Sequence, residues 1–210
     1  IYLCSNELPY NYNNLYEVNA AGTFTIHTDN AAGCDSTITL TVTVNTQPSA
    51  AINLTPAVRC GEGAVTLTAH AGQNGTTCRW YASENDNEVL FTGTSYVINN
   101  LAATNTYYVS SYNEYNGHPC ESGRQAITAT INTNPAEPTV EDQVRCGNGQ
   151  VEFTATVDTN ANTCRWYMTQ ATSTISATGL TYAPTINTTA TNGTTFYVES
   201  FNTNTNCKSS

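Results

Sequence analysis

An internal repeat with a fixed offset is the feature that most constrains how this chain folds. The segment RCGEGAVTLTA at 59–69 returns as RCGNGQVEFTA at 145–155, and TTCRWYAS at 76–83 returns as NTCRWYMT at 162–169. The two Cys-Arg-Trp-Tyr blocks stand 86 residues apart, as do Cys60 and Cys146. Self-similarity at one offset indicates tandem copies of a single structural unit.

The repeat divides the chain into three modules. Two Pro-containing segments, TQPSA at 46–50 and TNPAEP at 133–138, are predicted linkers. We therefore expect a truncated module of immunoglobulin-like or PKD-like type over 1–47, a complete immunoglobulin-like module over 48–134, and a third over 135–210. After Cys120 the second module continues into GRQAITATIN, a last strand with no counterpart after Cys207. Because the chain also opens in mid-pattern, we expect it to be part of a longer, exported polypeptide.

Short strands and turns dominate each complete module. AVTLTAH at 64–70 alternates, a Gly/Asn turn follows, and CRWYAS places Cys78 and Trp80 on one face and Arg79 and Tyr81 on the other. Short strands with turn signals between them predict a sandwich. The expected fold class is all-β, with tandem antiparallel immunoglobulin-like β-sandwich modules. Short Pro-containing linkers predict that the modules are arranged as an extended rod.

Composition and motifs argue against several functions. The net charge is -10, and the six Lys and Arg residues are each isolated, so nucleic acid is not an expected partner. No apolar run of 18 residues is present, so we expect no membrane insertion. His27, His70 and His118 do not recur at equivalent positions, and no short paired cysteine spacing is present. The acidic run ENDNE at 84–88 is lost in the second copy, which favours a solvated turn over a calcium site. We therefore expect neither an enzyme nor a cofactor or metal.

Eight cysteines in a repeating layout indicate an oxidising compartment. Cys78 and Cys164 each stand two residues before an inward-facing Trp, so we predict that both are buried free thiols. The alternative is that they bond to Cys120 and Cys207.

The remaining cysteines allow two layouts. Cys60 precedes the second strand of its module and Cys120 lies in the turn between the last two strands, at opposite ends of a sandwich. The second strand spans roughly 20 Å, whereas a disulfide needs Cα atoms within about 7 Å. Stacking modules head to tail instead pairs Cys4 with Cys120 and Cys60 with Cys207, and leaves Cys34 and Cys146 to pair outside the fragment. The competing layout keeps the bonds within modules, as Cys4–Cys34, Cys60–Cys120 and Cys146–Cys207.

An aromatic and basic face recurs in both complete modules. Alternation leaves the following side chains outside: Arg79, Tyr81, Tyr108 and Tyr112 in one copy, and Arg165, Tyr167, Tyr197 and Phe201 in the other. One interpretation is a flat binding face for glycans or proteins. The other is a cross-strand ladder with Arg stacked on Tyr. Repetition in every module favours the ladder.

The motifs RCGxGxVxxTA, CRWY, TYYV and CES or CKS resemble the Ig-like repeats of large Bacteroidetes cell-surface adhesins. CSNELPY, AGTFT and GCDSTITLTVTV in the first unit resemble a companion repeat of the same proteins. The resemblance implies export by the type IX secretion system and an extracellular location on a Gram-negative cell surface. In this bacterial group Asp35-Ser36-Thr37 matches an O-glycosylation acceptor pattern, with Ser36 as the attachment point.

The function that this resemblance implies is a structural stalk or filament that mediates attachment or gliding. Its partners would be neighbouring modules, other copies in a filament, or surface glycans and proteins. The alternative is a carbohydrate-binding or spacer region of a secreted glycan-degrading enzyme. The rest of the polypeptide distinguishes the two, because further repeats favour the adhesin and a catalytic domain favours the enzyme.

Overall fold

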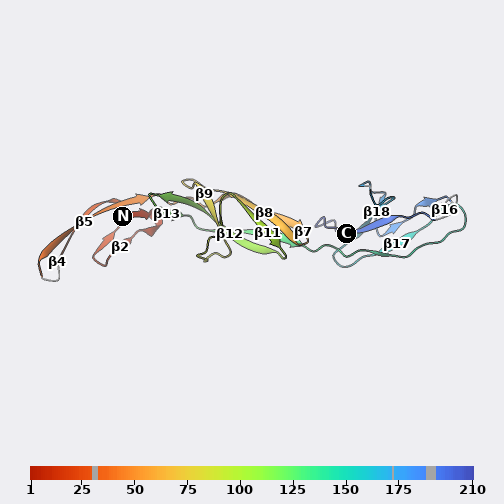
Figure 1. The fold of residues 1–210 in the computed structure, drawn as a ribbon, viewed down its shortest axis with the longest axis horizontal. Helices are drawn as coiled ribbons and strands as arrows, with labels where there is room; N and C mark the ends of the chain where they lie inside the picture. Colours follow the sequence, from red (N-terminus) through yellow and green to blue (C-terminus); the bar gives the residue numbers. More distant parts are fainter. Residues whose placement is uncertain (30–32, 172, 188–192) are drawn as a thin grey trace. The chain divides into compact units, whose positions relative to one another are not determined.

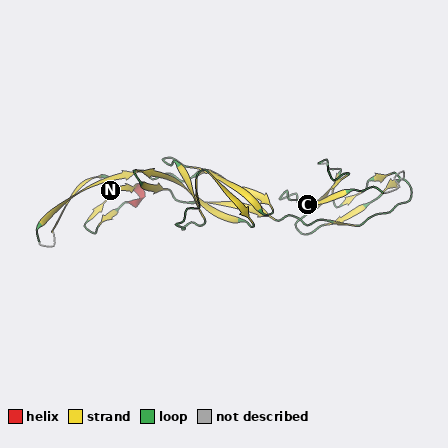
Figure 2. Ribbon diagram, viewed as in Figure 1, coloured by secondary structure: helices red, strands yellow, loops and turns green. Residues whose placement is uncertain are grey.

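The fold is all-β, as predicted (Figures 1 and 2). A computed structural model describes residues 1–29, 33–171, 173–187 and 193–210. Within these ranges the only helical element is a single 3-10 turn, η1 (Ser5–Glu7). No described helix is long and apolar enough to cross a membrane. The extended arrangement of the modules stays a prediction.

Contacts between residues divide the chain into two compact units. The first unit consists of Ile1–Ala57, Ala64–Asn99 and Asn105–Ala129, and so contains the first module and most of the second. The second unit consists of Val58–Gly63, Asn100–Thr104 and Thr130–Ser210, and so contains the third module and three short segments of the second.

The first module has two small sheets around its own core. Strands β1 (Tyr2–Cys4), β5 (Asp35–Asn45) and β4 (Gly22–Asp29) form one sheet, in which β1 runs parallel and β4 antiparallel to β5. Strands β2 (Tyr10–Tyr12) and β3 (Tyr16–Val18) form a hairpin. Alternate residues of these strands face inward, which gives a core of Leu3, Val18, Ile26, Leu40 and Val42.

The second module is a sandwich of two sheets. One sheet has the order β10 (Phe91–Thr92), β9 (Thr77–Tyr81), β12 (Asn105–Tyr115), β14 (Gln125–Asn132) and β7 (Ala57–Cys60). The other has the order β11 (Ser95–Leu101), β8 (Gly63–His70) and β6 (Ile52–Thr55). The predicted inward residues of β8 and β9 are buried, and Trp80 is fully enclosed. Its indole N–H donates to the carbonyl of Gly93 at 2.8 Å, which satisfies the polar edge of a buried ring.

The first half of β12 pairs with β14, and its second half, from Tyr112 to Tyr115, forms a hairpin with β13 (His118–Glu121). The turn of this hairpin is Asn116-Gly117, and both residues have positive φ, as a tight two-residue hairpin turn requires. Cys120 lies within β13, opposite Asn113 of β12. The expectation that Cys120 lies in a plain turn is therefore wrong, because the hairpin adds a strand before the chain enters β14.

The third module repeats this plan with shorter strands. Its sheets have the orders β15 (Thr139–Val140), β17 (Phe153–Thr156), β20 (Thr181–Tyr182); β16 (Gly149–Gln150), β21 (Thr185–Ile186); and β19 (Ala177–Thr178), β18 (Thr163–Tyr167), β22 (Tyr197–Phe201). Trp166 is buried, and its indole N–H donates to the carbonyl of Gly179 at 2.9 Å. This bond repeats the bond between Trp80 and Gly93.

The two copies of the RCG motif differ in structure. In the second module Ala57–Cys60 is strand β7, which neighbours β14 in the sheet. The equivalent residues 143–146 of the third module are exposed and outside any strand. The sequences are close to identical, so local sequence alone does not decide whether this segment forms a strand.

Candidate functional site

The joint between the first and second modules is a covalent contact inside the first unit. Cys4 is the last residue of β1, and β5 holds it opposite Asn45. Its Sγ is bonded to Sγ of Cys120 in β13, with the two Cα atoms 5.6 Å apart. Both cysteines are buried. The bond therefore attaches the sheet of the first module to the β12–β13 hairpin of the second.

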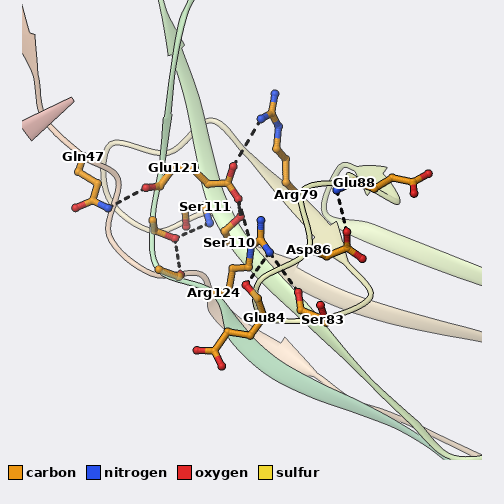
Figure 3. A network of polar contacts seen from close by, with 12 residues as sticks. Gln47, Arg79, Ser83, Glu84, Asp86, Glu88, Ser110, Ser111, Glu121 and Arg124 are labelled. Atoms are coloured by element: carbon orange, nitrogen blue, oxygen red, sulfur yellow. Dashed lines mark hydrogen bonds and ion pairs between the residues drawn. The ribbon is translucent and has the colours of Figure 1, made fainter. Parts of the chain in front are cut away.

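Polar contacts surround this disulfide. The backbone N–H of Cys4 donates to Oε2 of Glu7 at 2.6 Å, and Nε2 of His118 lies 2.8 Å from the same oxygen. Nε2 of Gln47 donates to the carbonyl of Glu121 at 2.8 Å (Figure 3). Gln47 lies in the segment that joins the modules, so the contacts hold both the hairpin and the linker.

A second disulfide lies inside the second unit. Cys60, the last residue of β7, is bonded to Cys207, with their Cα atoms 5.5 Å apart. The two bonds are the pairs that head-to-tail stacking predicts, and each joins cysteines of successive modules. The sequence intervals that they close overlap, because Cys60 stands between Cys4 and Cys120.

The within-module layout is not the one that the structure has, since Cys60 and Cys120 are bonded to other partners. Cys34 and Cys146 are exposed and lie outside these two bonds. That they pair outside the fragment stays a prediction.

Cys78 and Cys164 are buried thiols. Both have no measurable exposure, and each lies on the inner face of its strand, two residues before the buried Trp. Burial raises the pKa of both thiols, because the thiolate would lose its hydration. Their alternative partners Cys120 and Cys207 are bonded elsewhere, so the buried-thiol interpretation agrees with the structure.

Beside the first joint, a polar network covers the outer face of β9 and β12 (Figure 3). The guanidinium of Arg79 lies over the ring of Tyr112, 3.5 Å from its centroid, and that of Arg124 lies over Tyr81 at 3.4 Å. Glu121 lies between the two arginines, with Nη1 of Arg79 at 3.6 Å and Nε of Arg124 at 4.0 Å. The hydroxyl of Ser110 also donates to Glu121.

The third module carries a similar network with a rearranged charge. Arg165 lies over the ring of Phe201 at 3.3 Å, as Arg79 lies over Tyr112. The carboxylate here belongs to Glu199 of β22, which accepts from the Tyr167 hydroxyl at 2.6 Å and from Lys208 Nζ at 3.0 Å. Burial, and then the hydrogen bond to Glu199, raise the pKa of Tyr167 to about 12.

Three of the eight residues on this outer face are too buried for a flat aromatic binding face, which was the less favoured of the two interpretations. Tyr81, Tyr112 and Phe201 are buried under the arginines, with exposures of 2%, 8% and 6%. Tyr108 and Tyr167 are half-buried, and Tyr197 is 37% exposed. The stacked rings instead form the cross-strand ladder that was the other interpretation.

Sequence reasoning missed Glu121, Arg124 and Glu199, which complete these networks. Glu121 and Lys208 each follow directly after equivalent cysteines, Cys120 and Cys207. Their opposite charges were the signal in the sequence that this position takes part in an ion pair. Arg124 lies 43 residues after Tyr81, too far for strand alternation to connect them.

Two further candidate sites have simple outcomes. Cys4, Glu7 and His118 come close enough to resemble a metal-binding group, but the sulfur of Cys4 is committed to a disulfide. Ser36, the predicted O-glycosylation residue, lies in β5 opposite Thr28 and is half-buried. It is therefore a strand residue, and its glycosylation stays a prediction.

Comparison with known protein families identifies the family of this chain. The family described as Ig-like domain, CHU_C associated, matches twice, over residues 47–132 and 135–210. The chain belongs to this family. The two CHU_C-associated Ig-like domains coincide with the second and third modules to within a few residues.

Solved structures with related folds are distant in sequence. The fibronectin(III)-like modules of Clostridium thermocellum CbhA are 13% identical, cover 78% of this chain and 90% of theirs, and give a TM-score of 0.41. A crystal structure of titin domains is 15% identical in sequence, and the match covers 90% of this chain and 72% of that one, with a TM-score of 0.41. The ectodomain of mouse nectin-like molecule 4 is 16% identical in sequence, and the match covers 80% of this chain and 65% of that one, with a TM-score of 0.31. No curated protein matches the chain.

Proposed function

We propose that this chain is a structural spacer in the stalk or filament of a secreted cell-surface adhesin. Tandem Ig-like modules of this family are typical of structural segments. The resemblance to Bacteroidetes surface repeats supports export by the type IX route and a place on the outer surface of the cell. Binding to a surface or to another cell would then be the task of other parts of the polypeptide.

The observation that carries the proposal is the disulfide at the joint. Modules linked only by a flexible segment are free to swing. Cys4–Cys120 removes that freedom, and Glu7 with His118 and Gln47 with Glu121 add polar contacts around it. A joint that restricts the movement of successive modules suits a stalk that bears tension.

The spacer role is tested by pulling single molecules from both ends. In the variant Cys60→Ser, Cys207→Ser only the first joint remains, and the shortest covalent path runs from Cys4 across to Cys120 and then along the chain. Its full extension is roughly 330 Å at about 3.5 Å per residue, against roughly 700 Å after reduction. Oxidised molecules that extend as far as reduced ones would refute a role in bearing tension.

The adhesin assignment needs a test on cells. An antibody against this chain is expected to label the surface of intact cells, and deletion of the polypeptide is expected to reduce attachment. A catalytic glycan-degrading domain in the same polypeptide would instead assign the chain to the alternative, the spacer of a secreted enzyme.

A further inference from the structure

Four side chains with metal-binding atoms meet at the joint between the first and second modules, and they belong to Cys4, Glu7, His118 and Cys120. One ligand atom each of Cys4, Glu7 and His118 lies within 4.8 Å of the other two, and Sγ of Cys120 is bonded to Sγ of Cys4. Thiolate sulfur, imidazole nitrogen and carboxylate oxygen are the ligands that zinc takes in proteins, usually four in a tetrahedron. The joint therefore gathers a complete set of zinc donors.

The four residues come as two short pairs, one from each module. Cys4 ends β1 and Glu7 ends the 3-10 turn η1, and the backbone N–H of Cys4 donates to Oε2 of Glu7 at 2.6 Å. His118 and Cys120 stand two residues apart on β13, so their side chains lie on the same face of that strand. Strand β1 contacts β13 (Figure 1). Local backbone structure thus positions each pair, and the contact between the strands brings the pairs together.

The spacing of the pairs suits a single ion. Nε2 of His118 lies 2.8 Å from Oε2 of Glu7, and the Cα atoms of Cys4 and Cys120 are 5.6 Å apart. Two thiolates on one tetrahedral zinc ion lie roughly 3.8 Å apart, because each Zn–S bond is about 2.3 Å long. Rotation about the bonds of the two side chains can supply that spacing once the bond between the sulfurs is broken.

We propose that the reduced joint is a zinc site, in which Cys4 and Cys120 are thiolate ligands, His118 is the imidazole ligand and Glu7 is the carboxylate ligand. Reduction transfers two electrons and two protons from a dithiol to the Cys4–Cys120 bond, and the dithiol becomes a disulfide. Both cysteines then lose their protons as they bind Zn²⁺. A disulfide oxidant reverses the transfer and releases the ion. The first joint is therefore closed either by a sulfur–sulfur bond or by zinc.

Solvent reaches this site from the side of the imidazole and the carboxylate. The side chains of His118 and Glu7 are 27% and 40% exposed, whereas Cys4 and Cys120 are buried. An ion thus meets His118 and Glu7 first and the sulfurs behind them. The hydrogen bond from the Cys4 N–H holds the Glu7 carboxylate in place, as partners outside the ligand set commonly do at zinc sites.

The second joint lacks the other two ligands. Cys60 and Cys207 form the equivalent disulfide, but Thr205 stands two residues before Cys207, and Gly63 stands three residues after Cys60. Across the part of the chain that the structure describes, the group at the first joint is the only one with three potential metal ligands. Reduction of the second joint yields a bare dithiol, which is two ligands short of a tetrahedron. The chain therefore contains its own control.

Zinc at the first joint keeps two modules attached to each other under reducing conditions. The ion bonds to Cys4 and Glu7 of the first module and to His118 and Cys120 of the second. Such a joint needs only these two modules, so the inference does not rest on the adhesin assignment.

The test uses the 210-residue chain with Cys34→Ser and Cys146→Ser, which removes the two exposed thiols. The chain is reduced with a dithiol, freed of reductant without air, and titrated with Co²⁺ as a spectroscopic probe. We expect one Co²⁺ per chain, with the visible bands of tetrahedral cobalt and a thiolate charge-transfer band, and we expect Zn²⁺ to displace it. The oxidised chain should show neither band. A reduced chain without these bands would overturn the proposal.

Cysteine variants locate the ion. In the same background, Cys60→Ser, Cys207→Ser is expected to keep the cobalt spectrum, and Cys4→Ser, Cys120→Ser is expected to lose it. The reverse result, or a spectrum that survives in both variants, would place the ion elsewhere and reject the first joint as the site.

Two further variants separate a four-ligand site from a dithiol alone. Glu7→Gln and His118→Ala are each expected to weaken Zn²⁺ binding at least about tenfold, because even changes around a zinc ligand set cost that much. The matched controls Glu17→Gln and His70→Ala change exposed residues of the first unit and should leave binding unaltered. Binding by Glu7→Gln and His118→Ala as tight as that of the reduced parent would show an adventitious dithiol complex only and would overturn the assignment.

Thermal unfolding gives a readout that is independent of the spectrum. An ion that binds the folded state raises its Tm, so Zn²⁺ should stabilise the reduced chain. Glu7→Gln alters one exposed side chain and keeps an acceptor for the Cys4 N–H, so it tests the site even where the cysteine variants do not fold. Zinc that raises the Tm of reduced Glu7→Gln as much as that of the reduced parent would contradict the proposal.

Discussion

Lys208 in the third module stands at the position of Glu121 in the second, and its ammonium lies 3.0 Å from the carboxylate of Glu199 on the adjacent strand. The third module therefore has a lysine where the second has a glutamate, and its carboxylate is on the neighbouring strand instead. In the second module Arg79 pairs with Glu121, and Ser110 occupies the position of Glu199. In the third module Arg165 pairs with Glu199, and Lys208 completes the group. Each sheet face thus keeps one carboxylate beside its stacked arginine, although two positions have exchanged roles.

This exchange predicts strong coupling between positions 199 and 208. Lys208→Glu alone places a second carboxylate beside Glu199 and is expected to lower the free energy of unfolding by about 1 kcal/mol. Adding Glu199→Ser recreates the pair Ser110 and Glu121 and is expected to recover most of that loss. Urea denaturation of the two single variants and the double variant measures the coupling. Simple additivity of the three changes would show that the charges act independently.

Removal of the first joint disulfide is expected to destabilise the first unit. The bond closes a loop with a sequence separation of 116, for which chain entropy predicts a contribution of about 5 kcal/mol. The variant Cys4→Ser, Cys120→Ser should therefore unfold at a clearly lower temperature in calorimetry, with Cys34→Ser as the control. Non-reducing peptide mapping of the unmodified protein checks the pairing, and a peptide that joins Cys60 to Cys120 would contradict it.

The thiols are expected to separate into two classes on alkylation. Cys78 and Cys164 are buried and their pKa values are raised, so little reactive thiolate is present and reagent has no access. Cys146 is exposed and should react in the native state. Mass spectrometry after iodoacetamide treatment, with and without denaturant, locates the labels. Label on Cys164 of the native protein before Cys146 reacts would reject the buried-thiol assignment.

Alkaline pH is expected to unfold the protein through tyrosines whose pKa values are raised. Burial raises the pKa of Tyr81, Tyr96 and Tyr112 above their usual value, and the pKa of Tyr167 is about 12. A raised pKa favours the protonated form in the folded state, so the stabilisation is complete below about pH 10. It is then lost as pH rises toward about 12. Absorbance near 295 nm should show these tyrosines titrating together with loss of structure, and Tyr167→Phe should remove one of them. Full ionisation of all tyrosines near pH 10 without unfolding would contradict this.

Several features were accessible from sequence because each depends on local pattern. The repeated CRWY block places Trp80 and Trp166 on inward positions, and strand alternation is sufficient for that. The between-module disulfide pairs were one of two layouts that the sequence left open. The length of a strand against the reach of a disulfide favoured them, given modules that stack head to tail. Alternation gives the side of the sheet on which Tyr81 lies but not what covers it. Arg124, which buries Tyr81, comes from another part of the chain.

Context decides the features that sequence did not reveal. Residues 57–60 and 143–146 are nearly identical, yet one segment is a strand and the other is not. In the second module the strand that neighbours 57–60 is β14, which lies more than 60 residues away in sequence and beyond the reach of local pattern. The hairpin of β12 and β13 was likewise read as a turn, since four residues around Cys120 give too short a pattern to identify a strand.

The overlap of the two disulfides also affects how the chain responds to proteases. A cut anywhere between Cys4 and Cys60 leaves the halves joined through Cys4–Cys120, and a cut between Cys120 and Cys207 leaves them joined through Cys60–Cys207. Between Cys60 and Cys120 both bonds hold. No single cleavage inside these intervals therefore releases a fragment, and a filament whose joints overlap in this way keeps its covalent continuity in surroundings rich in secreted proteases.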